Sequence, residues 1–299
     1  MSNSNEEVLP AWGSLPVEKY LLARWDSTST LSVTQQRDQL VQAFLKEDDV
    51  SPFTSTLSGA SLSTDMQNLI NTVLVPWRPQ KLRRIAEKYA CDMVFDSIVV
   101  LRTYYGGISD DAKMSRWFYD AAESFEDSNP GQDLFGGLED RWWHVLDDAS
   151  LFETGSEKWQ SVYNVLPELA TPALQRHFNQ YVVDSVKEEI SEILETRESD
   201  EDDYEDAVAA AAIQGCWLLI LDEEASKDEE MLLVFRDMKG DVVRQITIKP
   251  DEVENLPHYR LRGSIRESGY WTDAVVGKKY KSRGEVMRTV LPLVKAELE

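Results

Sequence analysis

Apolar residues recur every three or four positions through most of the first two thirds of the chain, which is the periodicity of amphipathic α-helices. Between Gln80 and Thr103 the apolar stripe widens until nearly every side is apolar, and this density predicts a long helix at the centre of a bundle. A β-strand from Ile98 to Leu101 is the competing interpretation of the same run. The segment from Ser109 to Phe125 predicts an amphipathic helix with Asp110 and Asp111 in its first turn, where the helix dipole favours acidic side chains.

Helix-start patterns place further helices before and after these two. One helix is expected after Pro16, and a capping box formed by Ser32 and Gln35 predicts the start of the next. Leu138–Ala149 is expected to form a short helix, and Thr171–Leu194 a long one that begins with a cap residue followed by proline. Together these patterns predict a helical, bundle-like body.

The apolar pattern changes beyond an acidic run at residues 195–206, in which eight of twelve side chains are acidic. Such a run repels itself and predicts a solvated linker. Three short, branched and apolar segments follow, Cys216–Leu221, Met231–Arg236 and Val242–Ile248, and Gly240 stands in a turn between the last two. Their length and spacing predict a small antiparallel meander.

The sequence therefore predicts a mainly α fold, with a helical bundle-like N-terminal domain and a small α+β C-terminal domain that contains a short antiparallel meander. The predicted divisions are a disordered tail at residues 1–13, the helical domain at 14–197, an acidic linker at 198–206 and the α+β domain at 207–299. The last of these domains ends in a basic segment.

Charge is the most unusual property of the composition. The 299 residues include 54 acidic and 31 basic side chains, which give a net charge of −23. A chain this acidic repels phosphate backbones and anionic membranes, and it attracts basic surfaces. We therefore expect a protein partner with a basic surface, no membrane partner and no broad nucleic-acid binding.

The basic residues concentrate near the C-terminus, where residues 258–295 contain nine lysines and arginines against three acids. Lys278, Lys279, Lys281 and Arg283 are the candidate binding residues in this stretch. One interpretation docks them on the chain's own acidic face or on an acidic partner. The alternative is an RNA-associated protein, in which nearby aromatic side chains stack on bases.

The N-terminal residues, the apolar runs and the cysteines predict the cellular compartment of the protein. The N-terminal residues have no pattern of a secretory signal, and the longest apolar run, Ala207–Leu221, is too short to span a bilayer. Cys91 and Cys216 lie in apolar runs, where a free thiol packs as a small hydrophobe and a reducing environment is expected. These features predict a soluble protein of the cytoplasm or the nucleus.

Carboxylates spaced by four residues are the candidates for a metal site. Asp92 and Asp96 stand one turn apart on the most apolar predicted helix, and Asp184 and Glu188 form a second row. Clustered carboxylate oxygens are the ligands that Mg²⁺ prefers, so the rows are suited to a magnesium diphosphate. The alternative is that these carboxylates face solvent or pair with nearby bases.

Two acidic rows in a helical body resemble the general plan of the isoprenoid synthases. The resemblance implies a Mg²⁺-dependent enzyme that binds a diphosphate in an aromatic helical cavity, where Arg141 or Arg102 would bind the phosphates. Neither row contains a DDxxD motif, and the Asn/Ser/Glu triad is not complete. His144 is a further candidate catalytic residue, but no HExxH, GxSxG or phosphate-binding glycine motif accompanies it.

The missing catalytic motifs and the uneven charge favour one function above the others. We predict an acidic intracellular protein without catalytic activity, which acts through protein–protein contacts or as a regulator and needs no cofactor. The first alternative is the Mg²⁺-dependent enzyme of small-molecule metabolism, and the second is the RNA-associated protein.

Overall fold

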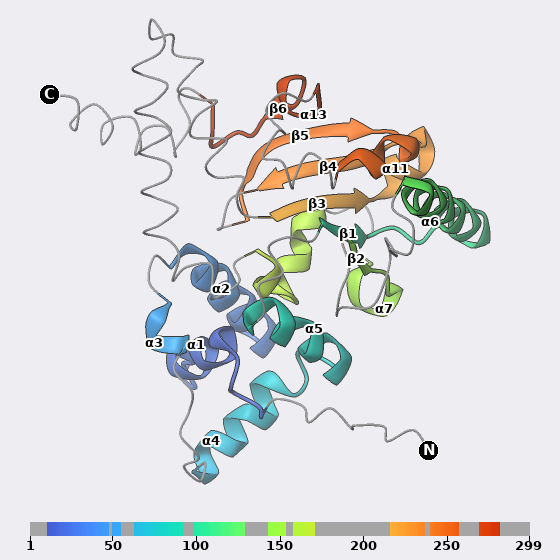
Figure 1. Ribbon diagram of the computed structural model, residues 1–299. Coiled ribbons are helices and arrows are strands. Elements are labelled where there is room, and N and C mark those ends of the chain that lie inside the picture. The colour runs from blue at the N-terminus through green and yellow to red at the C-terminus, as the bar shows by residue number, and fades with distance from the viewer. Residues whose placement is uncertain are drawn as a thin grey trace, which may run out of the picture. The chain divides into compact units, whose positions relative to one another are not determined.

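The computed structural model divides the chain into two compact units, whose elements are labelled in Figure 1. Unit 1 comprises Met1–Val94 and Ser161–His177, and unit 2 comprises Phe95–Gln160 and Phe178–Glu299. The residues that the structure describes are 11–47, 50–54, 63–91, 98–128, 143–153, 158–170, 216–236, 240–256 and 269–281. Within them, no helix combines the length and the apolar character needed to cross a membrane.

The described part of unit 1 is helical. Its elements are α1 (Pro16–Arg24), α2 (Val33–Lys46), α3 (Ser51–Thr54), α4 (Thr64–Leu69), the π-helix η1 (Ile70–Leu74), α5 (Gln80–Cys91) and the 3₁₀ helix η4 (Pro167–Leu169). The capping box predicted for α2 is confirmed, because the Ser32 hydroxyl accepts a hydrogen bond from the Gln35 amide at 3.2 Å and the Gln35 side chain accepts one from the Ser32 amide at 3.1 Å. The helix predicted after Pro16 is present as α1.

Apolar side chains from these helices meet in one core. The ring of Tyr20 packs edge-on against Phe44 and Phe53, with centroids 5.4 and 5.1 Å apart. The buried members of the same cluster are Val17, Tyr20, Leu21, Val41, Phe44, Val50, Ile70, Val73, Leu74 and Trp77. Removal of this apolar surface from water is the main stabilising contribution in unit 1.

A buried ion network joins α1, the segment before α5, α5 itself and η4. Glu18 is fully buried and accepts hydrogen bonds from Arg83 Nε at 2.9 Å, from Arg83 Nη2 at 3.2 Å and from the Gly13 amide at 2.9 Å. Arg78 Nη1 donates to both carboxylate oxygens of Glu168 at 2.8 Å, and Arg78 Nη2 lies 3.5 Å from Glu18. Two carboxylates therefore neutralise two guanidinium groups away from water.

Tryptophan rings complete the surroundings of both guanidinium groups. Arg83 Cζ lies 3.7 Å from the centre of the Trp12 ring, and Arg78 Cζ lies 3.9 Å from that of Trp77. Burial raises the pKa of Glu168 above its ordinary value, and the charge of Arg78 only partly opposes this effect.

A six-stranded mixed sheet forms the centre of unit 2. Its strands are β1 (Ile98–Arg102), β2 (Trp143–Leu146), β3 (Cys216–Leu221), β4 (Met231–Arg236), β5 (Val242–Ile248) and β6 (Val275–Val276). They lie in the order β2-β1-β3-β4-β5-β6. The pairs β2–β1 and β1–β3 are parallel, and the pairs β3–β4, β4–β5 and β5–β6 are antiparallel (Figure 1).

The predicted fold class, a mainly α protein with a short antiparallel meander, is wrong. The three strands predicted from the sequence are present as β3, β4 and β5 with the expected bounds, but they are half of a larger mixed sheet. The other parallel strands, β1 and β2, come from two segments that were predicted to be helical. Unit 2 is therefore a mixed structure of helices around a sheet with both parallel and antiparallel pairs.

The helix predicted over Gln80–Thr103 ends at Cys91, and its second half contains β1. The competing strand interpretation of Ile98–Leu101 is thus confirmed. The two states look alike in sequence because β1 pairs on both sides and its residues Val99, Val100 and Leu101 are fully buried. A strand that is buried on both faces has the same continuous apolar run as a buried helix.

The short helix predicted over Leu138–Ala149 is also wrong in the described part of that range. Trp143–Leu146 forms β2, which pairs with β1 in parallel register. A separate single turn, α7 (Ala149–Phe152), follows, and its N-cap Asp148 accepts a hydrogen bond from the Ser150 amide at 3.1 Å. The pairing with β1 is a contact distant in sequence, and the local pattern does not contain it.

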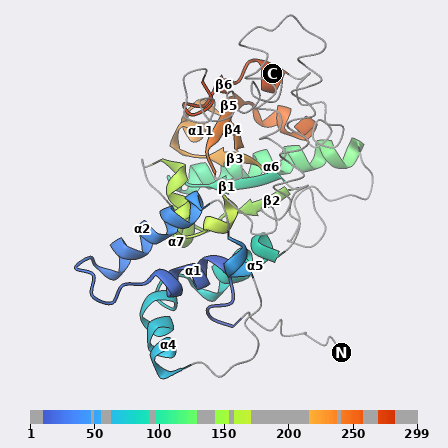
Figure 2. The ribbon, with the colours of Figure 1, turned by 90° about the vertical axis from the view of Figure 1, so that its left-hand side faces the viewer.

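Helices and turns surround the sheet of unit 2. They are α6 (Ile108–Ser128), α7, α11 (Glu223–Asp228), η5 (Pro250–Asn255) and α13 (Gly269–Thr272). The amphipathic helix predicted from Ser109 is confirmed as α6, which follows β1 in the chain and contacts η5. Figure 2 shows α6 from the side. A further 3₁₀ helix, η3 (Trp159–Asn164), spans the sequence boundary between the two units.

Several predicted features lie outside the described residues. They are most of the N-terminal tail, the acidic linker at 198–206 and the helix predicted over Thr171–Leu194. The domain boundary placed at the linker therefore stays a prediction.

Candidate protein-binding surface

The carboxyl ends of β1, β2 and β3 lie at one edge of the sheet, because the three strands are parallel neighbours. Arg102 is the last residue of β1, Asp147 follows β2, and Asp222 follows β3. The carboxyl edge of parallel strands is where open α/β sheets most often bind their ligands. Polar side chains gathered at this edge are therefore the first candidates for a functional site.

Arg102 links three of the elements that meet there. Its side chain is buried, and Nε donates a hydrogen bond to the Tyr104 carbonyl at 3.0 Å. Nη2 donates to Asp111 of α6, and Nη1 lies 3.6 Å from Asp147 beyond β2. The Tyr105 ring centre lies 4.3 Å from Cζ, so the guanidinium is also stacked. One arginine thus holds two carboxylates at fixed positions on the edge.

Further polar contacts fasten the first turns of α6 to α11. The Ser226 hydroxyl donates to Asp110, and Lys113 Nζ donates to the Ser226 carbonyl at 2.6 Å. Lys113 Nζ also lies 3.5 Å from a carboxylate oxygen of Glu229. The side chain of Asp222 caps α11 by accepting an amide hydrogen bond at 2.9 Å. The acidic residues of α11 are consequently neighbours of those at the start of α6.

We call the surface formed by these segments the acidic edge. Its carboxylates are Asp110, Asp111, Asp147, Asp148, Asp222, Glu223, Glu224, Asp228, Glu229 and Glu230. Three bases in these segments pair with carboxylates: Arg102 with Asp111, Lys113 with Glu229, and Lys227 with Glu223 at 2.6 Å. Arg116, farther along α6, is exposed. The bases are too few to neutralise the carboxylates, so a strongly negative surface remains for a cationic ligand.

Burial of basic side chains makes the excess of negative charge at the surface larger. Among the described residues, the buried charged side chains are two glutamates, Glu18 and Glu168, and six arginines, Arg37, Arg78, Arg83, Arg102, Arg236 and Arg244. Arginine tolerates burial because its planar guanidinium pairs and stacks at the same time. Positive charge is thus withdrawn into the core, and the described surface is more acidic than the composition alone implies.

Tyr105 adds a buried hydroxyl beside Arg102. Its hydroxyl donates to the Arg102 carbonyl at 3.2 Å. Burial raises the pKa of the Tyr105 hydroxyl well above its ordinary value, and the negative charge of Asp147 raises it further. The hydroxyl therefore stays protonated at neutral pH, as its hydrogen bond to the Arg102 carbonyl requires.

Most of the site residues predicted from the sequence lie outside the described segments. They are Asp92, Asp96, Arg141, Asp184, Glu188 and Arg283. The described residues contain no group of three or more histidine, cysteine or acidic side chains arranged to hold a metal ion. The magnesium hypothesis therefore stays a prediction. His144 lies in β2, in register with Val99 of β1.

The basic residues predicted to bind a partner fall in a turn after β6. Lys278 and Lys281 are exposed, whereas Lys279 Nζ lies 2.7 Å from a carboxylate oxygen of Asp241. One of the predicted binding lysines therefore pairs with an acid of the same chain. This contact agrees with the interpretation that the basic segment docks on acidic groups.

Sequence reasoning named Arg102 only as a phosphate ligand and missed its partner Asp147. The signal was present: two aspartates, Asp147 and Asp148, directly follow the apolar Trp143–Leu146. Interpreted as a strand parallel to β1, that segment would have placed both aspartates beside the end of β1. Prediction of this site from the sequence therefore required that Trp143–Leu146 be interpreted as a strand.

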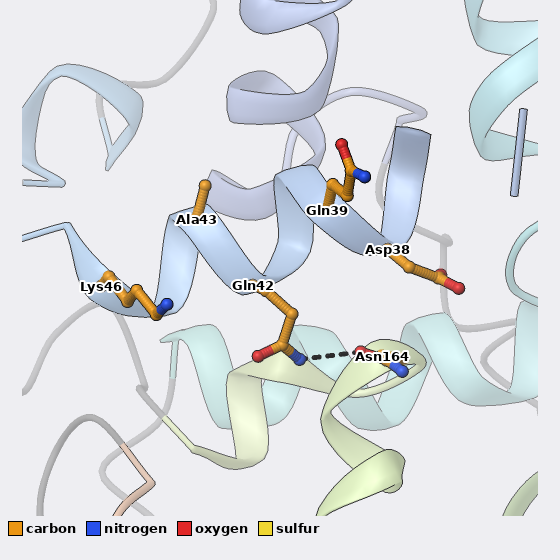
Figure 3. A pocket seen from close by; sticks show the side chains of 6 residues that line it. All are labelled: Asp38, Gln39, Gln42, Ala43, Lys46 and Asn164. Carbon is orange, nitrogen blue, oxygen red and sulfur yellow. Dashed lines mark hydrogen bonds between the residues drawn. The ribbon is translucent and has the colours of Figure 1, made fainter. Parts of the chain in front are cut away.

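Unit 1 contains a separate groove along α2, drawn in Figure 3. It has a volume of about 470 Å³ and is lined by Asp38, Gln39, Gln42, Ala43, Lys46 and Asn164. Gln42 Nε2 donates to Asn164 Oδ1 at 2.8 Å, which joins α2 to η3 across the groove (Figure 3). Half of its lining residues are amides, and one acid and one base balance in charge, unlike the side chains of the acidic edge.

Comparison with known proteins assigns no role to these surfaces. The chain matches no family model, and neither a curated protein nor a solved structure is significantly similar to it.

Proposed function

We propose that the protein is a non-catalytic binding or regulatory protein, and that the acidic edge of unit 2 binds a partner with a basic surface. The observation that carries the proposal is the separation of charge. Six arginines are buried in the described part of the chain, while carboxylates collect at one edge where Arg102, Lys113 and Lys227 already pair with acids. Such a surface is complementary in charge to the cationic side chains of a basic partner.

The net charge of the chain also predicts that binding of such a partner depends on salt concentration. A net charge of −23 attracts a basic protein over distances of several ångströms and speeds its approach. Salt screens these interactions, with a screening length of about 10 Å at 0.1 M ionic strength. The complex is therefore expected to form readily at low salt and to weaken as salt is added. We place it in the cytoplasm or the nucleus, where Cys91 and Cys216 would stay reduced.

Purification of the native protein from its own cells at an ionic strength of about 50 mM tests the proposal. The expected result is a basic protein in constant ratio to this chain, released when the ionic strength is raised to about 300 mM. An acidic partner, or a complex that is insensitive to salt, contradicts the proposal.

The same preparation distinguishes the two alternatives. A monomer that retains magnesium and a diphosphate-containing small molecule supports the enzyme of small-molecule metabolism. Co-purification of RNA that is lost when the basic residues Lys278, Lys279 and Lys281 are neutralised supports the RNA-associated protein.

A further inference from the structure

Arg37, in the first half of α2, is buried without an acidic partner. The residue is 9% exposed, and its Nε atom has no hydrogen-bond partner. Its contacts in the described part of the chain are a hydrogen bond from Nη2 to Thr34 Oγ1 at 3.5 Å and a ring contact, in which Cζ lies 5.9 Å from the centre of the Trp77 ring. Both distances are at the outer limit for contacts of their kind.

Other buried arginines of the chain are paired. Arg78, Arg83 and Arg102 each form an ion pair with at least one carboxylate, whereas Arg37 forms none in the described segments. A buried charge without a counter-charge destabilises the folded chain. Burial accordingly lowers the pKa of the Arg37 guanidinium below its ordinary value, and the charge of Asp38 only partly opposes this effect. Charges that the fold keeps in this state are typical of functional positions.

The guanidinium of Arg37 points back toward the first turn of α2. Long side chains on a helix lean toward its N-terminus, and the contact of Nη2 with Thr34, the second residue of α2, gives this direction here. Thr34 is exposed, so the guanidinium lies beside the protein surface. Asp38 follows Arg37 about 100° farther around the helix and lines the groove of Figure 3 instead.

The first turn of α2 also has backbone donors that are not used. The capping box satisfies the amides of Ser32 and Gln35. The amides of Val33 and Thr34 donate no hydrogen bond within the described segments, and both residues are exposed. Free amides at a helix N-terminus carry partial positive charge and attract anions. Two amides, the Thr34 hydroxyl and the Arg37 guanidinium are therefore neighbouring donors.

We propose that the first turn of α2 and Arg37 bind the phosphate group of a small molecule. The inference concerns unit 1 alone and does not depend on the proposed function. A phosphate group combines about two negative charges with three acceptor oxygens, which suits two amides, a hydroxyl and a guanidinium. A carboxylate has only two oxygens for the same donors. A nucleic-acid backbone is disfavoured, because the net charge of −23 repels a long polyanion.

The bound phosphate supplies the counter-charge that Arg37 lacks. Removal of the Arg37 charge should therefore not destabilise the chain when phosphate is absent, because no partner is left behind. Arg78→Met is the opposite case, since it leaves Glu168 buried and unpaired. This difference separates a ligand-binding arginine from one that only stabilises the fold.

Binding of inorganic phosphate to the full chain tests the proposal. Broadening of the phosphorus NMR signal measures it at a constant ionic strength of about 50 mM, with acetate as the competing anion. Arg37→Met removes the guanidinium, and Thr34→Val removes the hydroxyl but keeps the branched side chain. The matched control is Arg24→Met, because Arg24 is exposed and its Cζ also lies 5.9 Å from an aromatic ring, that of Tyr20.

The expected result is that Arg37→Met weakens phosphate binding about tenfold or more, Thr34→Val weakens it several-fold, and Arg24→Met leaves it unchanged. Denaturant unfolding without phosphate should show Arg37→Met to be at least as stable as the native chain. Three results overturn the proposal: no phosphate binding by the native chain, equal binding by the native chain and Arg37→Met, or displacement of phosphate by equimolar acetate. A loss of stability in Arg37→Met as large as that in Arg78→Met also overturns it, because Arg37 is then structural. Thr34→Val, which keeps Arg37, tests the site even if Arg37→Met does not fold.

Discussion

The buried ion network of unit 1 and the buried Arg102 of unit 2 pair arginine with carboxylates in opposite ways. In unit 1, Arg78 and Arg83 are matched by Glu18 and Glu168, and all four side chains are buried. In unit 2, Arg102 is buried as well, but its partner carboxylates, Asp111 and Asp147, have side chains that are 57% and 38% exposed. The first arrangement neutralises charge within the core, whereas the second fixes negative charge at the surface.

This difference separates a stabilising network from a binding surface. Charges buried together depend on one another, because removal of one leaves the others without a partner and without water. Charges at an edge remain solvated and contribute little to stability, but they stay accessible to a ligand. We therefore expect substitutions in unit 1 to affect stability most, and substitutions at the acidic edge to affect binding most.

The largest effect is expected from Glu18→Gln. The substitution removes the carboxylate that faces both Arg83 and Arg78, so unit 1 should lose about 3–5 kcal/mol of unfolding free energy. Denaturant unfolding followed by tryptophan fluorescence measures the loss. The matched control is Glu223→Gln, whose pair with Lys227 is exposed to solvent and should contribute little to stability. Similar losses in the two variants would remove the distinction between the units.

A smaller loss is expected from Arg102→Met. Methionine keeps much of the aliphatic contact that the arginine side chain makes. The two carboxylates that lose their pairing with Arg102 can be hydrated, so the unfolding free energy should fall by about 1–3 kcal/mol. Unfolding monitored by circular dichroism gives the value. A loss as large as that of Glu18→Gln would show that Asp111 and Asp147 behave as buried partners, against the 57% and 38% exposure of their side chains.

The stability of unit 1 should depend on pH through the carboxyl group of Glu168. Burial raises the pKa of this carboxyl above its ordinary value of 4.5. For a group whose pKa is raised by folding, the contribution to stability is complete below the unfolded pKa and is lost as pH rises through the folded pKa. The unfolding free energy of the native chain minus that of Glu168→Gln should therefore fall as pH rises from about 4.5. A difference that is constant or rising over the same pH series contradicts this assignment.

The smallest effect is expected at Glu229, which has a left-handed backbone conformation with φ of 58° just after α11. Glycine adopts this conformation without steric cost, so Glu229→Gly should raise the unfolding free energy of unit 2 by up to about 1 kcal/mol. Thermal unfolding measures the gain. The control Asp228→Gly lies within α11 and should lower the melting temperature, and a fall for both variants would contradict the backbone argument.

The features that sequence predicted well are those encoded locally. The capping box of Ser32 and Gln35 and the bounds of β3, β4 and β5 depend on neighbouring residues, and the structure confirms them. β1 was ambiguous, because a strand buried on both faces has no alternating pattern. β2 was missed, because only its pairing with β1 distinguishes it from a short helix.

The candidate surface depended on the same distant contacts. The pairing of Arg102 with Asp147 joins residues from two strands that are adjacent only in the folded sheet. The charge of the chain led us to predict a basic partner, and this stays a prediction, but composition does not say which carboxylates gather. That information came from the parallel order of β2, β1 and β3. Sequence analysis predicted helices over β1 and β2, and placed β3 in an antiparallel meander.

The most direct test of a binding surface confined to unit 2 is the affinity of a fluorescent oligolysine peptide for two charge-neutralised variants of the full chain. Glu224→Gln/Asp228→Asn removes two exposed carboxylates from the acidic edge, and Asp26→Asn/Asp65→Asn removes two from unit 1. The two variants have the same net charge. We predict that the first weakens binding several-fold at low salt and the second leaves it unchanged. Equal weakening by both variants would mean that the partner is attracted by net charge alone, and would contradict a binding surface at the acidic edge.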